Sequence, residues 1–154
     1  MSRESILLVG AGGHARACID VIEQEGRFAV KGLVGLPEEV GFRIFDYPVL
    51  GADVDLPALL SDCKNALVAV GQIKTPEPRM RLFDQLQLIE CVLPVIVSPH
   101  AYVSPHAKLD AGTIVMHGAV VNARAVVGKN CIINSQSLVE HDVVIADHCH
   151  IATA

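Results

Sequence analysis

One short stretch of the sequence gathers side chains that could move a proton. It begins at Asn134 and ends in Glu140, His141 and Asp142. A lone histidine in a turn is ordinarily a solvated surface residue, but a carboxylate beside it fixes its tautomer and makes it more basic. Neighbouring residues of an extended chain point to opposite sides, so we expect at most one of the two carboxylates to pair with the ring. The stretch therefore predicts a general base at His141.

Two further histidines, His148 and His150, follow closely. Three histidines within ten residues would suit a metal ion, but their orientations should differ and no acidic or thiol partner completes a tetrahedral set, so no metal is predicted. Cys149 takes a small, inward position and should be a packed thiol. His117 should stack on a ridge of turns without a charged partner.

A second candidate site lies near the N-terminus. An apolar strand over residues 5–9 leads into a glycine loop, residues 10–14, and then into helical spacing over residues 15–25. Glycines let the backbone approach a phosphate, and a helix N-terminus offers unpaired N–H groups and a positive dipole end. The loop therefore suits a ligand of the nucleotide type, the alternative being a tight turn with no ligand. Its candidate contacts are Gly10, Gly12, Gly13 and His14.

The strict dinucleotide fingerprint is not matched. The third glycine position holds Ala15, and the strand over residues 30–34 ends in Gly35 and Leu36, where an acidic residue is required. Binding of NAD is therefore disfavoured.

Further strands are expected over residues 65–70 and near residues 92–97, with a helix over residues 78–88 between them. Alternating strands and helices predict a small parallel α/β domain of Rossmann-like form, with its ligand crevice at the carboxyl ends of the strands. Gly71 and Gln72, which follow the strand over residues 65–70, would join the glycine loop there.

Three cations accompany that helix, and they are Lys74, Arg79 and Arg81. They could neutralise phosphates, but on a short helix we expect them to form a solvated face.

From residue 95 onward the chain reads as ten six-residue units, each with an aliphatic third residue. These residues are Val97, Val103, Leu109, Val115, Val121, Val127, Ile133, Val139, Ile145 and Ile151. A period of six conflicts with an α-helix and suits a short strand plus a turn, so we predict a parallel β-helix. With three units per coil, residues eighteen apart stack, and Arg124 would compete with His141 for the Asp142 carboxylate. The predicted domains are residues 1–92 and 93–154.

Ten units supply roughly three and a third coils, which is near the minimum for a stable array. The last unit ends at Ala154 with a bare sheet edge, which natural solenoids usually close. We therefore expect the β-helix to be partial and the chain to be a fragment whose parent continues for several coils.

The composition of the chain limits the kinds of binding partner that we expect. The formal charge of −5 and the lack of a basic block argue against nucleic acid. The apolar stretches are short and interrupted, and the first residues do not form a signal peptide, so no membrane association is predicted. Five cysteines without C-x-x-C spacing indicate reduced thiols and a cytoplasmic protein.

These motifs, in this order, resemble the sugar O/N-acyltransferase family of the hexapeptide-repeat superfamily. The resemblance rests on the glycine loop, on Gly71 and Gln72, and on the stretch from Asn134 to Asp142, and it covers essentially the whole chain. The family includes sialic acid O-acetyltransferases and bacterial N-acetyltransferases of nucleotide-linked amino sugars. It implies a left-handed β-helix and a homotrimer with active sites between subunits.

The resemblance also implies a role for each candidate residue. His141 looks like the general base, Asp142 like the residue that orients it, and His150 like a contact of the acetyl donor. Asn134 matches a polar position of the substrate pocket. The glycine loop, with Gly71 and Gln72, looks like the nucleotide-sugar site, although the acidic residues common after the second strand in relatives are missing at Gly35 and Leu36.

Residues and resemblance together predict direct transfer from acetyl-CoA, most simply to the amine of a nucleotide-linked sugar. The alternative acceptor is a hydroxyl of sialic acid or a related sugar. Two alternatives belong to other functional classes. The first is a non-catalytic trimerising scaffold, and the second, more distant one is an NAD-dependent oxidoreductase. The family takes its oxyanion donor from a coil beyond His150 and builds its CoA cleft from later coils, so we expect the 154 residues alone to be poorly active.

Overall fold

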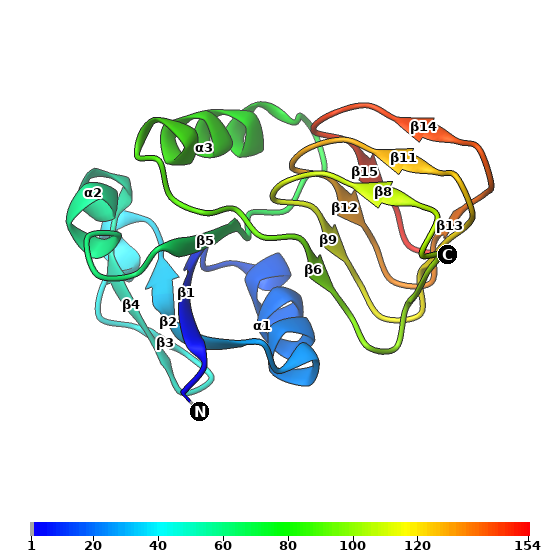
Figure 1. Ribbon diagram of the computed structural model, residues 1–154. Helices are drawn as coiled ribbons and strands as arrows, with labels where there is room; N and C mark the ends of the chain where they lie inside the picture. Colours follow the sequence, from blue (N-terminus) through cyan, green and yellow to red (C-terminus); the bar gives the residue numbers. More distant parts are fainter. Residues whose placement is uncertain (1) are drawn as a thin grey trace.

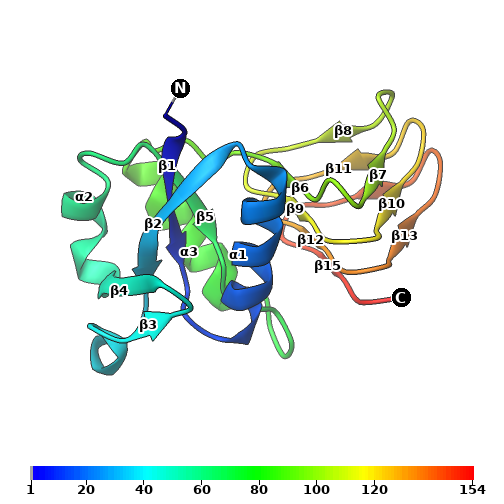
Figure 2. The ribbon, with the colours of Figure 1, turned by 90° about the horizontal axis from the view of Figure 1, so that it is seen from below.

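A computed structural model describes residues 2–154, which form an α/β part and a three-sided prism of stacked coils (Figures 1 and 2). None of the helices in these residues is long and apolar enough to cross a membrane.

The α/β part is built on a five-stranded sheet with the order β3-β4-β2-β1-β5. The strands are β1 (Glu4–Val9), β2 (Phe28–Val34), β3 (Arg43–Ile44), β4 (Tyr47–Gly51) and β5 (Asn65–Val68). All neighbours are parallel except β3 and β4, which form an antiparallel edge hairpin. The helices are α1 (Gly13–Glu25), α2 (Leu56–Leu59) and α3 (Glu77–Leu88), with short 3-10 turns η1 (Pro37–Glu39) and η2 (Asp53–Asp55).

Strand β1 is buried on both faces, as its unbroken apolar run requires. Ile6 and Leu8 pack in the cluster that contains the buried side of α1. Leu7 and Val9 pack in the opposite cluster with residues of α2 and α3. The sheet is therefore covered by helices on both faces, as the alternation of strands and helices predicted. The α2 segment and the β3–β4 hairpin were not predicted.

The prism confirms the predicted parallel β-helix. Its strands are β6 (Ile96–Val97), β7 (Tyr102–Val103), β8 (Lys108–Leu109), β9 (Ile114–Val115), β10 (Val120–Val121), β11 (Val126–Val127), β12 (Ile132–Ile133), β13 (Leu138–Val139), β14 (Val144–Ile145) and β15 (His150–Ile151). They stack as three parallel sheets, β7-β10-β13, β8-β11-β14 and β6-β9-β12-β15. Val121 pairs with Val103 and Val139, eighteen positions to either side, so three units make one coil. The third residues of the units fill the interior.

The sixth residue of each unit from the third unit onward adopts a left-handed conformation at a corner of the prism. Three corner ridges result. Gly112, Asn130 and His148 form the first, Gly118, Gln136 and Ala154 the second, and Arg124 and Asp142 the third, all with φ between 52° and 74°. Glycine adopts this conformation freely and asparagine or aspartate tolerates it, whereas Arg124, Gln136 and His148 adopt it at a cost in backbone energy.

One face of the prism is covered by the α/β part. The outward residues Ile96, Ile114 and Ile132 are buried in the same cluster as α1. Their counterparts on the other two faces, which include Tyr102 and Val144, remain exposed. Two apolar faces of the prism are thus left open.

Candidate functional site

A cavity of 330 Å³ opens at the carboxyl ends of β1 and β2. Gly10 and Gly12 line it, together with Val34 and Leu36 from the end of β2 and Leu82 from α3. The α1 helix begins beside it, with Gly12 as N-cap, no side-chain cap and no acidic residue in its first turn among the described residues. The N–H groups of this helix end therefore have no side-chain cap within residues 2–154, and the anion binding expected of the glycine loop stays a prediction.

The charged side chains of this cavity are Glu39, Asp53 and Arg81. Sequence reasoning missed Glu39 and Asp53, and it considered Arg81 for phosphate binding but expected it on a solvated face. Glu39 lies in η1, just after β2, and its carboxylate accepts the Leu36 N–H at 2.8 Å. A Cβ at Gly35 would lie 2.5 Å from that carboxylate, so a larger residue there would require the Glu39 side chain to shift. The acidic group that the sequence lacks at Gly35 and Leu36 thus reaches the cavity from Glu39.

His14 turns away from solvent at the start of α1. A Cβ at Gly71 would lie 3.4 Å from the His14 Cβ, so the loops after β1 and β5 touch. The Nε2 of His14 is buried and has no hydrogen-bond partner among residues 2–154. Burial, with the charge of Arg79 and the nearby His150, lowers the pKa of His14 from 6.5 to about 4.

This pKa predicts a loss of stability in acid. Between pH 6.5 and about 4 the unfolded chain binds a proton at His14 and the folded protein does not. The free energy of unfolding should therefore fall as the pH falls, by at most about 1.4 kcal/mol per pH unit from this group. Urea unfolding of the wild type and of His14→Gln across this range measures the difference. Equal slopes for the two proteins would show that His14 does not carry the effect.

Gln72, Asn134 and His150 come together where the coils meet the α/β part. The His150 Nδ1–H donates to the Gln72 carbonyl oxygen at 2.7 Å, and its Nε2 accepts from the Asn134 amide at 2.9 Å. The Asn134 Oδ1 accepts the Ser135 N–H at 2.8 Å, which fixes the orientation of the amide and hence this tautomer. Residues predicted as substrate and donor contacts thus form one bonded group across 78 positions of sequence.

The expected solvated face on α3 is wrong for Arg79, which is fully buried. Its guanidinium donates to carbonyl oxygens at the end of β5 and to Asn130 in the coils. Arg81 is exposed, as expected, and its Nη1 lies 3.1 Å from the Asp53 carboxylate.

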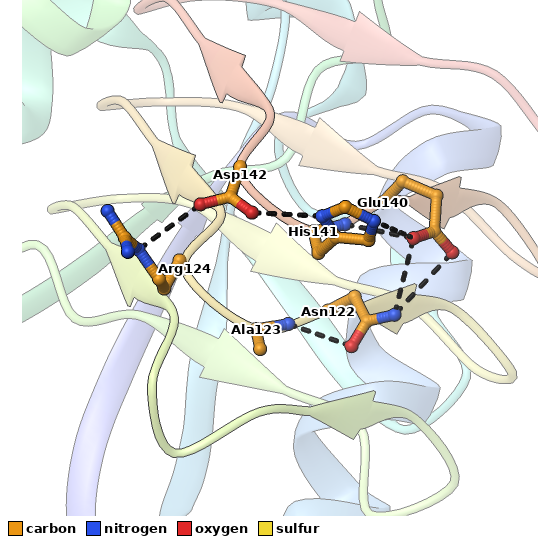
Figure 3. A network of polar contacts seen from close by, with 6 residues as sticks. All are labelled: Asn122, Ala123, Arg124, Glu140, His141 and Asp142. Carbon is orange, nitrogen blue, oxygen red and sulfur yellow. Dashed lines mark hydrogen bonds and ion pairs between the residues drawn. The ribbon is translucent and has the colours of Figure 1, made fainter.

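His141 lies on the ridge of Arg124 and Asp142, at the corner between β13 and β14 (Figure 3). Its Nδ1 donates to the Asp142 Oδ2 at 2.9 Å, while its Nε2 is 3.9 Å from the Glu140 carboxylate. Glu140 instead accepts the His141 backbone N–H at 3.0 Å. One carboxylate therefore holds the ring, and Nε2 is left as the basic atom.

The expected competition from Arg124 does not break this pair. The Arg124 Nε approaches Asp142 Oδ1 at 3.1 Å, so each carboxylate oxygen has its own partner. The hydrogen bond to Asp142, followed by the charges of Asp142 and Glu140, raises the pKa of His141 above 6.5. The ring is exposed on its own chain, where solvent weakens these charges.

His117 does have a charged partner, contrary to expectation. Its Nε2 donates to the Asp20 carboxylate of α1 at 2.6 Å, and its Nδ1 accepts from the Ser98 hydroxyl at 2.5 Å. Asp20 belongs to the α/β part, whereas the prediction considered only the residues that stack with His117 on one ridge of the coils.

Within a single chain, the candidate residues fall into separate places. Gly10, Gly12 and Gly13 border the cavity or the open end of α1, and His150 lies with Gln72 and Asn134. The β13–β14 corner that carries His141 lies on the side of the prism away from the α/β part (Figure 1). No hydrogen bond or ion pair among the described residues joins it to the other two places.

A glycine-loop α/β part joined to hexapeptide coils, with a carboxylate-paired histidine at a corner, defines an acyltransferase of the hexapeptide-repeat superfamily. The chain belongs to the family of PglD N-terminal domains, whose family model matches residues 5–86. The membership predicted from the sequence is therefore confirmed. No curated protein matches the chain significantly.

Solved structures agree with this assignment. Perosamine N-acetyltransferase (PerB) from Caulobacter crescentus, in complex with CoA and GDP-perosamine, is 29% identical with a TM-score of 0.87, covering 97% of this chain and 69% of that chain. The acetyltransferase domain of PglB from Neisseria gonorrhoeae is 28% identical with a TM-score of 0.87, covering 98% of this chain and 72% of that chain. It has also been solved with acetyl coenzyme A. WeeI from Acinetobacter baumannii, at 21% identity and a TM-score of 0.81 with 97% and 70% covered, shares the fold.

Proposed function

We propose that this protein transfers the acetyl group of acetyl-CoA to the amine of a nucleotide-linked amino sugar, with His141 as general base. The observation that carries the proposal is the His141 ring, whose Nδ1–H is held by Asp142 while Nε2 makes no hydrogen bond within residues 2–154 and lies 3.9 Å from the Glu140 carboxylate. Two similar structures support the substrates, since one holds CoA with GDP-perosamine and the other acetyl-CoA.

The chemistry follows from the tautomer. The sugar amine attacks the thioester carbonyl carbon, a C–N bond forms, and His141 Nε2 takes the proton that the nitrogen loses. The C–S bond then breaks, and the CoA thiolate recovers that proton from the imidazolium. Holding both substrates together converts the reaction to an intramolecular one, and the base adds its own factor, so no acyl-enzyme is needed.

The cavity beside the glycine loop is the proposed place of the nucleotide. The open N-terminus of α1 faces the diphosphate, with Gly12 and Gly13 allowing close approach. Gln72 and Asn134 would contact the sugar, and His150 the acetyl donor, because the three already form one bonded group.

A homotrimer would complete this site. The outward residues Tyr102, Val126, Leu138 and Val144 leave two apolar faces exposed, and such faces mark interaction surfaces. A neighbouring copy packed there would bring its own His141 ridge to the sugar end of the cavity, which a single chain does not do. With this assembly we propose a left-handed coil, the division at residues 92 and 93, and a cytoplasmic location consistent with the five free cysteines.

Two measurements test the proposal. Thermal shift of the 154-residue chain with UDP, GDP and their amino sugars should show stabilisation, because a ligand that binds only the folded state raises stability. Release of free CoA thiol by the protein should require an amino sugar. Turnover with sialic acid in its place would instead favour O-acetylation, and no turnover with any sugar would leave the scaffold reading.

Asp142→Asn should distinguish the role of the Asp142 carboxylate from that of the Glu140 carboxylate, the two acidic groups beside His141. His141 works as a base only when neutral, so the rate falls as the pH drops through its pKa, which Asp142 raises. The substitution should reduce kcat by about 10-fold and shift the acidic limb of the pH profile to lower pH. Glu140→Gln should move that limb less, since Asp142 holds the ring. An unchanged limb in Asp142→Asn would contradict the assigned pair.

A further inference from the structure

Helix α3 sits on one corner ridge of the prism, formed by Gly112, Asn130 and His148. Phe83 occupies the space above Gly112, where a Cβ would lie 2.8 Å from its ring. The same ring meets His148 edge-on, with centroids 5.5 Å apart and planes at 76°. The ridge is therefore a docking surface for a helix that also lines the nucleotide cavity through Leu82.

Arg79 lies at the centre of this contact as a fully buried cation. Its Nη1 donates to the carbonyl oxygens of Val68 and Val70, at 3.1 and 2.7 Å. Its Nη2 donates to the backbone oxygen of Asn130 at 3.2 Å and to the Oδ1 at 2.8 Å. No carboxylate among residues 2–154 forms an ion pair with it. One guanidinium thus joins the end of β5 to a coil residue that lies 51 positions after Arg79 in the sequence.

Asn130 completes the junction from the other side. Its Nδ2 donates to the Arg79 carbonyl oxygen at 3.2 Å and to His148 Nδ1 at 3.0 Å. The backbone oxygen of His148 accepts from Gln72 Nε2 at 3.1 Å, and the backbone oxygen of Gln72 accepts from His150 Nδ1. A continuous chain of contacts therefore runs from Arg79 to His150.

A buried cation without an anion is an expensive way to hold two surfaces together. Apolar side chains of similar volume often give equal or greater stability. The planar fork of the guanidinium instead fixes direction, because each of its two terminal nitrogens reaches a different structural element. This arrangement specifies relative position.

We propose that Arg79 and Asn130 are positioning residues that hold the nucleotide cavity and His150 at a fixed separation. The inference rests on the proposed function, in which the cavity binds the nucleotide and His150 meets the acetyl donor. A small error in that separation would misplace amine and thioester, and misplacement by about 1 Å can cost about 100-fold in rate. The pair would thus act on transfer and not on nucleotide affinity.

Asn130→Gly is the sharpest test, because glycine keeps the left-handed turn and removes the three side-chain hydrogen bonds of Asn130. Gln136→Gly is the matched control, since Gln136 holds the same turn position on a ridge where it covers Gly118. Arg79→Lys is the second variant, which keeps the charge and loses the fork. Ring nitrogen NMR reports the tautomers of His148 and His150, GDP and UDP titrations report the affinity of the cavity, and initial rates of thiol release give kcat.

We expect Asn130→Gly and Arg79→Lys to change both histidine ring signals, to keep the nucleotide Kd within about threefold, and to lower kcat by about 10- to 100-fold. Gln136→Gly should match the wild type in all three. Unchanged His150 signals, an unchanged kcat, or a Kd that weakens in step with kcat would each overturn the inference. If the wild type shows no transferase activity, the proposed function is refuted but the inference about Arg79 and Asn130 is not. The histidine ring signals and the nucleotide Kd values still test whether the two residues connect the cavity to His150. If Asn130→Gly does not fold, the same three measurements on Arg79→Lys test the inference.

Discussion

Replacing His141 with alanine is expected to lower kcat by about 100- to 10,000-fold, the range that a positioned general base contributes. The KM for the nucleotide sugar should change little, because in the proposed trimer His141 reaches the sugar end of the cavity and not the part that we assign to the nucleotide. The ring is exposed, and within residues 2–154 its polar contacts are with its sequence neighbours Asp142 and Glu140, so the variant should fold normally. Initial rates of thiol release, with circular dichroism of the same samples, measure both effects.

His106→Ala is the control for this variant, because His106 is a turn histidine on the same side of the prism, two coils before Asp142. It should turn over substrate at the wild-type rate. His141→Ala with a rate within about threefold of the wild type would show that the corner is not catalytic and would favour the scaffold reading.

The prism was predictable because its information is local. A period of six places the third residue of each unit inside the prism. Because three units close one coil, residues eighteen positions apart stack on one another. The sequence also predicted that one carboxylate would pair with His141, since the two side chains are neighbours in sequence. It could not supply the handedness of the coil, which came from the resemblance, because ordinary crossovers are right-handed.

The remaining features depend on contacts between distant segments. Arg79 has the spacing of the buried face of α3, with Leu82 and Phe83, but its charge favoured a solvated position. Its burial depends on carbonyl oxygens at the end of β5 and on Asn130, which the sequence of the helix does not reveal. Asp20 meets His117 across 97 positions of sequence. Glu39 reaches the cavity by folding back over Gly35, a path that is set by η1. Periodicity reports which face of an element is buried and not which residue of another element meets it.

Gly10→Ala should destabilise the protein by about 2 to 5 kcal/mol. Gly10 has φ of 134°, and a Cβ there would lie 2.7 Å from the backbone nitrogen of Val70 and 2.8 Å from the carbonyl carbon of Ala69. Both atoms belong to main chain that cannot move aside cheaply, because Ala69 N–H donates to the Val9 carbonyl oxygen at 2.8 Å. Urea unfolding measures the loss.

Gly13→Ala separates the turn role of the glycine loop from its ligand role. A Cβ at Gly13 meets nothing within 4 Å, and the residue begins α1, so alanine should leave stability unchanged or raise it by up to about 1 kcal/mol. Its methyl group would stand where the proposed diphosphate approaches the helix end, so the Kd for GDP or UDP should rise about 10-fold, which is about 1.4 kcal/mol. Unchanged nucleotide affinity in a stable Gly13→Ala protein would mean that the loop is only a tight turn. A weakened affinity at full stability would assign Gly10 to the fold and Gly13 to the ligand.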